Sequence, residues 1–567
     1  MKHIAHSWIE NDPDPDTRQE IQHLLDSDQT LILQQRLNQR LQFGTAGLRG
    51  EMGAGLNRMN RLVILQTTVG LAEYLQQIKG SDQQQSVVVG YDGRHQSQTF
   101  AEDVTRVLCA YGIRVYLLDR VCPTPLISFG IPTLGCDAGI MITASHNPPE
   151  YNGFKLYWRN GAQINAPHHL AIQELIEKHA FKPIKTMELV TAENQKRLVY
   201  LNESYIKNYL DYVLSFKHLS SQPASCKNIS VAYTALHGVG YQITQQLMSA
   251  LELKHFYTVE NQAQPNGDFP TVAYPNPENR SALQALLNLA QQHKTQLAFA
   301  HDPDADRLAV AVRDDSNAYQ VLTGDQIGCL LADYLLTQAA DPKSACIGNS
   351  LVSSSMLKAI VAAHQAHSFQ TLTGFKWLAN TAQAHTQNKP TLAFAYEEAL
   401  GYMFGDLVWD KDGVHALIIF IEMVAKLQQQ NLTIFDKLTE LYRKHGLYLH
   451  QQVSVNLTSE NENLMQRLRT HLPTHLGAEP VQQVEDLLNV GTDGLSQVSK
   501  LPPCDMLIYH LPQCRIIVRP SGTEPKLKFY YEWRCSLNPH NDRIDQQTAQ
   551  NELNQFIAIH QQLIFKP

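Results

Sequence analysis

Three aspartates at alternate positions carry the strongest chemical signal in this chain of 567 residues. Asp302, Asp304 and Asp306 follow a short apolar run at 297–300. In an extended loop, residues two apart point to the same side, so the three carboxylates repel one another unless a cation lies between them. Oxygen ligands favour a hard ion such as Mg²⁺ or Ca²⁺. A solvated acidic turn is the alternative interpretation.

Arg307 directly follows the third aspartate. A guanidinium group binds phosphate through two parallel hydrogen bonds, so an arginine beside a metal indicates an anionic ligand. An EF-hand calcium loop is excluded, because its glycine position falls on Arg307 and its final glutamate on Arg313.

A second polar loop, at 143–149, follows the apolar run at 140–142. It contains Ser145 and His146, and Lys155 lies shortly after it. A serine at the end of a strand could act as a nucleophile or carry a phosphate group, and the lysine could stabilise phosphate or move a proton. An ordinary turn is the alternative.

Three further loops contain residues that suit anions or sugar hydroxyls. The segment at 519–526 combines an arginine, two hydroxyls and a glycine, which is typical of an anion-binding loop. It is not a P-loop, since no G-x-x-x-x-G-K-[ST] motif occurs. The segment at 43–50 is rich in glycine and contains Arg49, and the adjacent acids Glu397 and Glu398 could accept hydrogen bonds from sugar hydroxyls or be solvated.

Taken together, these loops resemble those of the α-D-phosphohexomutase superfamily, the phosphoglucomutase and phosphomannomutase enzymes. The matching segments occur in the family's order and span almost the whole chain; they are FGTAGLRG (43–50), TASHNPPEYNGFK (143–155), DPDADR (302–307), TGFKW (373–377), YEEALGY (396–402) and RPSGTEPK (519–526). The forms TGFKW and YEEALGY resemble most the branch that holds phosphopentomutase-like and some bacterial phosphoglucomutase enzymes.

The resemblance implies an α/β protein with three related α/β domains and a smaller C-terminal α+β domain around a central cleft. We expect domain boundaries near residues 215, 320 and 445. The resulting domains and the loops they would carry are 1–215 (phosphoserine loop), 216–320 (metal loop), 321–445 (sugar-recognition loop) and 446–567 (phosphate-binding loop).

The resemblance also implies roles at the reacting phosphate. Ser145 matches the serine that carries the transferable phosphate, and its phosphate oxygen would join Asp302, Asp304 and Asp306 as a ligand of Mg²⁺. The residues around the reacting phosphate, with Lys155 as a general acid/base, would be Arg49, His146, Lys155 and Arg307.

At the other end of the substrate, Thr373 and Glu397 match positions that contact the sugar, and Lys411 matches a lysine that reaches the substrate. The site for the non-reacting phosphate would comprise Arg519, Ser521, Gly522 and Thr523. Ala399 occupies a position where many hexose-phosphate members have serine, so one contact to a sugar hydroxyl would be missing.

The function implied is a phosphosugar mutase that works through a phosphoserine and a bisphosphate intermediate. We expect glucose 1-phosphate and glucose 6-phosphate as the interconverted pair, Mg²⁺ as cofactor and glucose 1,6-bisphosphate as activator. Mannose phosphates and the pentose pair, ribose 1-phosphate and ribose 5-phosphate, are the alternatives. Two other classes are a Mg²⁺-dependent phosphatase with Asp302 as nucleophile and a non-catalytic sugar-phosphate sensor.

The elements that must position these loops alternate along the chain. Short apolar runs that end in polar, glycine-bearing loops are typical of buried parallel strands; they lie at 86–90, 140–142, 229–233, 297–300 and 392–395. Helical patterns occur at 325–336 and 351–364, and the segments 515–518 and 526–533 suit an antiparallel hairpin. Near the start, Thr17 and Glu20 form a possible capping box for a helix that ends near residue 40, and a metal site at the neighbouring aspartates is disfavoured.

Composition excludes several other classes. The chain has 46 basic and 54 acidic residues, a net charge of −8, which gives no electrostatic reason to expect nucleic-acid binding. With 43% hydrophobic residues it can bury large cores. The first residues lack a signal-peptide pattern, and the most apolar run, at 416–421, is too short to span a membrane. The nine cysteines form no C-x-x-C pair. We expect a soluble cytoplasmic protein that acts on small sugar phosphates and needs no protein partner.

Overall fold

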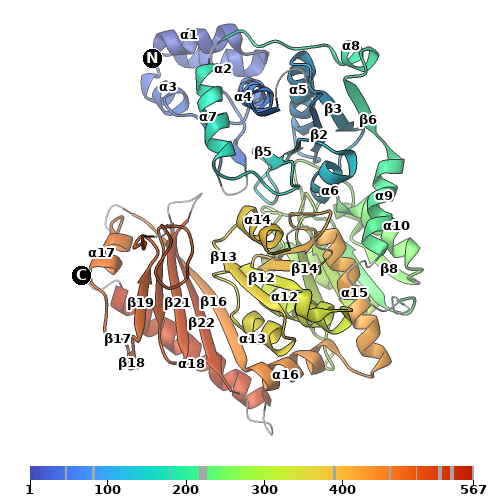
Figure 1. Cartoon of the computed structure of the whole chain (residues 1–567), viewed down its shortest axis with the longest axis vertical. Helices are drawn as coiled ribbons and strands as arrows, with labels where there is room; N and C mark the ends of the chain where they lie inside the picture. Colours follow the sequence, from blue (N-terminus) through green and yellow to red (C-terminus); the bar gives the residue numbers. More distant parts are fainter. Residues whose placement is uncertain are drawn as a thin grey trace.

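The structure is a computed structural model that describes residues 1–44, 47–79, 84–180, 182–215, 226–386, 391–458, 461–492, 494–521, 526–536 and 542–564. Within these residues, three mixed sheets and one five-stranded antiparallel sheet follow one another along the chain, and a small two-stranded sheet accompanies the last of them (Figure 1). The parts built around the four sheets are called domains I to IV below. The expected fold, three related α/β domains and a C-terminal α+β domain, is confirmed.

The sheet of domain I has the strand order β1-β5-β4-β2-β3-β6. Its strands are β1 (Leu48–Glu51), β2 (Ser86–Tyr91), β3 (Arg114–Leu118), β4 (Ala138–Ile142), β5 (Tyr151–Trp158) and β6 (Leu198–Leu201). The helices in this part of the chain are α1 (Lys2–Asn11), α2 (Pro15–Asp26), α3 (Thr30–Leu37), α4 (Arg61–Lys79), α5 (Ser97–Ala110), α6 (Pro125–Leu134), α7 (His168–Lys178), α8 (Leu189–Asn194) and α9 (Glu203–Leu214).

Domains II and III have smaller sheets of the same kind, with orders β11-β10-β9-β7-β8 and β13-β12-β14-β15. Domain II contains β7 (Ser230–Thr234), α10 (Gly240–Ala250), β8 (His255–Thr258), α11 (Gln284–His293), β9 (Leu297–His301), β10 (Leu308–Arg313) and β11 (Tyr319–Val321). Domain III contains α12 (Gly324–Gln338), β12 (Cys346–Ser350), α13 (Met356–Ala363), β13 (His367–Thr371), α14 (Phe375–Thr386), β14 (Ala393–Glu397), β15 (Gly401–Gly405), α15 (Gly413–Gln429) and α16 (Ile434–His445).

The sheet of domain IV is antiparallel, with the order β16-β22-β21-β20-β19. The hairpin predicted from the sequence is confirmed as β21 and β22. The elements of this domain are β16 (Leu447–Asn456), α17 (Leu464–Thr470), β17 (His475–Leu476), β18 (Glu479–Pro480), β19 (Gln483–Asp486), β20 (Leu507–His510), β21 (Cys514–Pro520), β22 (Lys526–Cys535) and α18 (Asp542–Ile564).

One connection recurs in the first three domains. In each sheet a buried parallel strand is followed by an antiparallel neighbour: β4 by β5, β9 by β10, and β14 by β15. The loop inside each pair holds one of the predicted site segments, namely Ser145 in domain I, Asp302 to Asp306 in domain II, and Glu398 in domain III. The three sheets therefore share this connection, and the loop within it has a different set of polar side chains in each domain.

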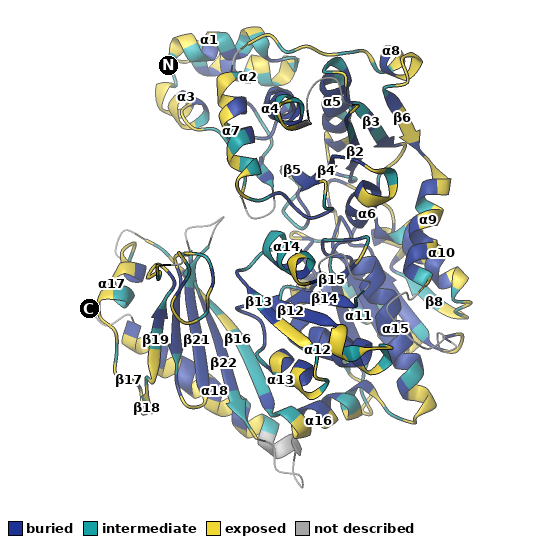
Figure 2. Cartoon of the chain, in the orientation of Figure 1, coloured by how far each residue is buried: buried dark blue, intermediate teal, exposed yellow. Residues whose placement is uncertain are grey.

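The strands lie in the interior because their apolar runs cannot be solvated favourably. All five predicted strand runs are confirmed to within a residue; they correspond to β2, β4, β7, β9 and β14. One buried apolar cluster extends through all four domains and includes Val88, Val231, Ile347 and Ile516. Figure 2 shows this pattern, with buried strands between helices whose outer faces are exposed. Among the described residues, no helix is long and apolar enough to cross a membrane.

The amino-terminal prediction is wrong in detail. The chain begins with a helix, α1, and the expected single helix to residue 40 is two helices, α2 and α3. Asp14 caps α2 by accepting the backbone N–H of Asp16, while Thr17 lies inside the helix and donates its hydroxyl to Asp12. The aspartates of this run therefore serve as helix caps and turn acceptors.

The predicted helix at 351–364 is also too long. Helix α13 covers only its second part, because residues 351–355 form a loop held by hydrogen bonds to other elements. The predicted helix at 325–336 is confirmed within α12.

The packing of α12 on β14 gives a test of the fold. At Gly328 a Cβ atom would enter the ring of Tyr396, so the helix lies against the strand only because this side chain is missing. Helix propensity alone would make Gly328→Ala stabilising by about 1 kcal/mol, whereas overpacking costs about 1–3 kcal/mol. We expect the calorimetric unfolding midpoint to fall. Thr337→Ala, at an exposed position of α12, should not lower the midpoint, and an unchanged midpoint in Gly328→Ala would contradict the packing.

Candidate active site

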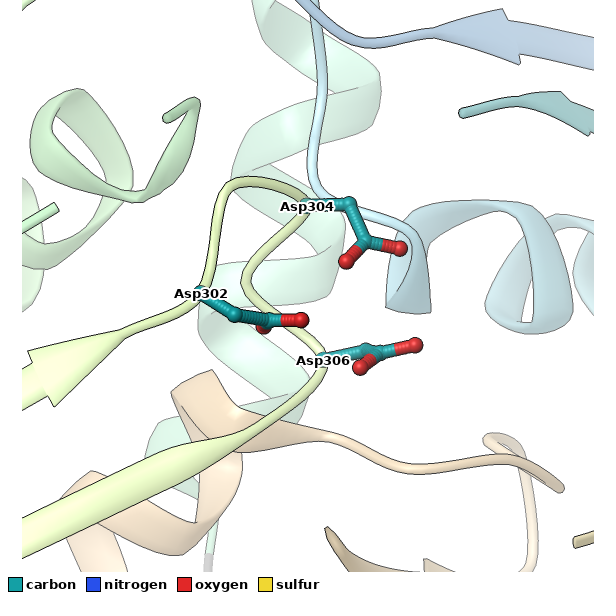
Figure 3. Close-up of side chains that lie close together, drawn as sticks. All are labelled: Asp302, Asp304 and Asp306. Atoms are coloured by element: carbon teal, nitrogen blue, oxygen red, sulfur yellow. The ribbon is translucent and has the colours of Figure 1, made fainter. Parts of the chain in front are cut away.

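The three aspartates lie in the loop between β9 and β10, and one oxygen from each falls within 4.8 Å of the others. All three side chains are fully buried. The loop is a turn rather than the extended segment expected: the N–H of Ala305 donates to the carbonyl of Asp302 at 2.9 Å, and Ala305 has φ +54°. Figure 3 shows that this turn makes the three carboxylates converge on one side of the loop.

The donor set fits a hard divalent cation. Oδ1 of Asp304 and Oδ1 of Asp306 are buried and have no hydrogen-bond partner within the described structure. Buried carboxylate oxygens without a partner are costly, and a Mg²⁺ ion bound by oxygen ligands would satisfy them. The remaining oxygens are held by protein groups: Oδ1 of Asp302 accepts the N–H of Arg307 at 3.0 Å, and Oδ2 of Asp304 accepts the hydroxyl of Thr124 at 2.6 Å.

Two lysines from other domains lie against these carboxylates. Lys155, in β5, donates to Oδ2 of Asp304 at 2.5 Å and to Oδ2 of Asp306 at 2.7 Å. Lys411, in the loop before α15, lies 3.0 Å from the same oxygen of Asp306. Burial lowers the pKa of Lys155, but the two carboxylates more than offset this, so its pKa is above the ordinary value and the ammonium form is favoured.

Ser145 lies at the carboxyl end of β4 in a left-handed conformation, with φ +54°. Its hydroxyl donates to Oδ2 of Asp302 at 2.8 Å, and Nδ1 of His146 lies 3.2 Å from the same Oγ. Burial and the charges of Arg307 and Arg49 lower the pKa of His146 well below its ordinary value, so its imidazole is neutral near pH 7. The structure therefore brings the serine, the histidine and the acidic loop together as predicted.

The Ser145 loop is held by two residues that sequence reasoning did not assign to the site. Asp92 accepts the hydroxyl of Thr143 at 2.6 Å, and Oγ1 of Thr143 accepts the N–H of Ser145 at 2.8 Å. Arg94 donates to the carbonyl oxygens of three residues of the loop and of the first residue of β5; they are Ser145, Asn147, Pro148 and Tyr151. The available signal was the segment Tyr91-Asp92-Gly93-Arg94, which ends β2 beside β4 at the carboxyl edge of the sheet.

The two predicted arginines flank this centre. Arg49, in β1, donates to Oδ1 of Asn147 at 2.7 Å. Arg307 donates to Oε1 of Glu278 at 2.6 Å and to the carbonyl of Ala399 at 2.9 Å, which links the acidic loop of domain II to domain III. The sequence analysis missed Glu278, because its loop has no motif that indicates such a contact.

The predicted sugar residues lie together in domain III. Oε1 of Glu397 accepts the N–H of Gly374 at 2.6 Å, next to Thr373, whose hydroxyl is buried and has no partner within the described structure. Burial raises the pKa of Glu397, and burial together with the charges of Glu397 and Asp325 raises the pKa of Glu398 to about 7. A buried carboxylate beside an unsatisfied hydroxyl can recognise a polar ligand.

The predicted phosphate-binding loop is described only in part. Arg519, in β21, donates to the hydroxyl of Tyr530 at 3.2 Å and stacks its guanidinium over that ring, with Cζ 5.7 Å from the ring centre. The N–H of Ser521 donates to the carbonyl of Lys526 at 2.8 Å. Gly522 and Thr523 lie outside the described residues. The described contacts of Arg519 are separate from those of Ser145 and the aspartates.

Comparison with protein families agrees with this arrangement. Three consecutive parts of the chain, 40–183, 207–315 and 323–444, match the phosphoglucomutase/phosphomannomutase alpha/beta/alpha domains I, II and III. Residues 474–542 match the C-terminal domain of the same enzymes.

Individual relatives cover nearly the full chain. A probable phosphoribomutase from Schizosaccharomyces pombe is 37% identical over 550 residues, covering 94% of this chain and 93% of its own. A probable phosphomannomutase from Haemophilus influenzae is 38% identical over 493 residues, covering 86% and 95%. In fold, the chain is similar to the open form of parafusin, a phosphoglucomutase from Paramecium, with a TM-score of 0.69, 18% identity and coverage of 93% and 95%. The chain belongs to the phosphoglucomutase/phosphomannomutase family, whose members are phosphomutases.

Proposed function

We propose that this protein interconverts sugar 1-phosphates with the corresponding 6- or 5-phosphates through a phosphate group carried by Ser145. The observation that carries the proposal is the placement of the Ser145 hydroxyl 2.8 Å from Asp302, within a group of three buried carboxylates. A serine in that position can pass a phosphoryl group to a substrate hydroxyl while the surrounding charges stabilise the transfer.

The reaction consists of two transfers. In the first, the bond between phosphorus and Oγ of Ser145 breaks as the bond to a free sugar hydroxyl forms, which yields a sugar bisphosphate. The bisphosphate then turns within the site, and its other phosphate returns to Oγ of Ser145. In each transfer the ammonium of Lys155 gives a proton to the oxygen that loses the phosphoryl group and takes one from the hydroxyl that gains it, so Lys155 is protonated again after the step.

The negative charge of the transferring group is spread over several cations. Arg49, Lys155 and Arg307 surround the phosphate, and the neutral His146 contributes a hydrogen bond at Ser145. Ser145, Asp302, Asp304 and Asp306 would hold Mg²⁺, which supplies neutralising charge to the phosphate oxygens when bound.

The other end of the substrate is recognised by domains III and IV. Thr373 and Glu397 bind sugar hydroxyls, Lys411 reaches the substrate, and the non-reacting phosphate binds at Arg519, Ser521, Gly522 and Thr523. One such clamp serves both steps, because either end of a bisphosphate such as glucose 1,6-bisphosphate presents a phosphate to it. The same bisphosphate acts as activator by phosphorylating Ser145. Ser145 is buried, which limits the access of water to the phosphoserine.

Glucose phosphate is the proposed substrate, and pentose phosphate is the second candidate. Recognition through the Glu397 carboxylate is polar, so it selects among sugars rather than among phosphates. Two observations favour the pentose: the side chain of Ala399 offers no hydroxyl to the sugar, and the Schizosaccharomyces pombe relative is called a phosphoribomutase. Mannose phosphate is the remaining alternative.

The role of Ser145 can be tested by mass. Ser145→Ala should fold normally and lose essentially all mutase activity, because it removes the hydroxyl that would carry the phosphate. After incubation with glucose 1,6-bisphosphate, intact-mass analysis should find one phosphate on the wild type and none on the variant. Ser249→Ala, which alters an exposed serine of α10, is the control. Near-normal turnover of Ser145→Ala would favour a phosphatase with Asp302 as nucleophile.

The metal site can be tested by chelation and titration. Chelation should abolish activity, and Mg²⁺ should restore it and raise the thermal unfolding midpoint. Asp304→Asn removes one anionic ligand and should raise the Mg²⁺ concentration needed for half-maximal activity by about tenfold or more. Asp315→Asn, in an exposed loop after β10, should behave as wild type. Activity that is indifferent to chelator would refute the site.

The sugar can be assigned from specificity constants. For the 1-phosphates of glucose, mannose and ribose under one bisphosphate activator, we expect glucose to have the highest kcat/KM. Ala399→Ser should shift the ratio further toward glucose, since it adds a hydroxyl beside Glu397. A preference of about tenfold for another sugar, or about 1.4 kcal/mol of discrimination, would overturn the glucose assignment and leave the transfer chemistry intact.

A further inference from the structure

A serine-rich loop, residues 350–355, lies between the sugar-recognition loop and domain IV. It begins at the last residue of β12 and is called the serine loop below. The hydroxyls of Ser350 and Ser353 donate to Oε2 of Glu398 at 3.1 and 3.0 Å, and Oγ of Ser353 accepts the N–H of Glu398 at 3.0 Å. The serine loop therefore holds the residue that directly follows Glu397.

The other side of the same loop is bound by domain IV. The guanidinium of Arg515, in β21, donates to the carbonyl of Ser353 at 2.9 Å. The N–H and the hydroxyl of Ser355 both donate to Glu532, in β22, at 2.6 Å. Arg515 and Glu532 are cross-strand partners, so one patch of the sheet holds both ends of this contact.

Apolar packing reinforces the contact. Leu351 and Val352 of the serine loop lie in one buried cluster with Ile517 and Tyr530 of domain IV. Leu372, next to Thr373, belongs to the same cluster. Domain IV therefore packs against the serine loop and against the residue that precedes Thr373.

Strand β21 sets the distance between the contact at Arg515 and the predicted phosphate-binding residue Arg519. Alternate residues of a strand point to the same side, so Arg515, Ile517 and Arg519 all face domain III. Arg515 is anchored to the serine loop, and Arg519 lies about 13 Å further along the strand at the ordinary rise per residue. Burial lowers the pKa of Arg519, and Tyr530, Glu398 and Glu397 more than offset this effect, which agrees with a guanidinium that faces the sugar loop.

We propose that Arg515 and Ser353 are positioning residues that fix the separation between the phosphate clamp at Arg519 and the sugar carboxylate at Glu397. Arg515 binds the serine loop, and the serine loop binds Glu398, so the two contacts form one continuous linkage. A fixed separation selects substrates by the distance between their hydroxyls and their far phosphate, which differs between a hexose 6-phosphate and a pentose 5-phosphate. This inference rests on the proposed mutase function. It adds that Arg515 and Ser353 determine which distance between sugar hydroxyls and phosphate the site accepts.

Two substitutions cut the linkage at its two ends. Ser353→Ala removes the hydroxyl bound to Glu398 and leaves the carbonyl bound to Arg515. Arg515→Lys keeps a positive charge, but a lysine lacks the planar fork that serves Ser353 and Glu532 together. Arg534→Lys is the matched control, because Arg534 also pairs with Glu532, at 3.0 Å, but has no described contact with domain III.

The first measurement is the ratio of kcat/KM for glucose 6-phosphate to that for ribose 5-phosphate, whose non-reacting phosphates would bind at Arg519. Each single variant should change this ratio by about threefold or more, and the double variant should match the larger single effect, because a linkage in series can be cut only once. Arg534→Lys should leave the ratio unchanged. An unchanged ratio in both singles, or effects that multiply in the double variant, would overturn the proposal.

The second measurement does not depend on activity. By hydrogen–deuterium exchange, Ser353→Ala should speed exchange in β21, and Arg515→Lys should speed exchange at Glu398 and its neighbours, each across the loop from the altered side chain. Faster exchange confined to the altered side would overturn the linkage. A wild type without mutase activity on any sugar phosphate would refute the proposed function instead, and the exchange data would still decide whether the linkage exists.

Discussion

The negative charge of three carboxylates buried in one loop is the constraint on which the rest of the site depends. At an effective dielectric constant near 20, two like charges about 4 Å apart repel by about 4 kcal/mol. Lys155 and Lys411 place ammonium groups against Asp304 and Asp306, and neither lysine belongs to the domain that carries the aspartates. The ion pairs between these lysines and aspartates therefore join domains I, II and III. They also gather positive and negative groups at a place where a phosphoryl group can be transferred.

The fold forms this site by repeating one strand–loop–strand connection. In domains I, II and III, the loop after a buried parallel strand turns back into an antiparallel neighbour, and that loop carries Ser145, the three aspartates or Glu398. Parallel strands end at one edge of a sheet, so polar side chains that follow them collect there. Domain IV is built differently, and it joins the others through the serine loop and the apolar cluster beneath it.

The strands and the acidic loop could be predicted because their signals are local. Apolar runs predicted the five buried strands, and the spacing of Asp302, Asp304 and Asp306 predicted a convergent group, although a turn at Ala305 produces it. The hydrophobic periodicity of the sequence could not predict the partners of these residues. Asp92 and Arg94 act on the Ser145 loop from another strand, and residues 351–355 have a helical pattern but are held in a loop by Glu398, Arg515 and Glu532. Tertiary hydrogen bonds decide these cases, and they depend on residues far away in sequence.

The proposed function requires that a phosphate on Ser145 is transferred to a sugar rather than to water. This transfer can be followed directly in a single turnover, by mixing enzyme labelled with radioactive phosphate at Ser145 with unlabelled glucose 1-phosphate and quenching at short times. The proposed function predicts that the label appears first in a sugar bisphosphate and that little is released as inorganic phosphate. Release of the label chiefly as inorganic phosphate, with no labelled bisphosphate at any time, would contradict the account.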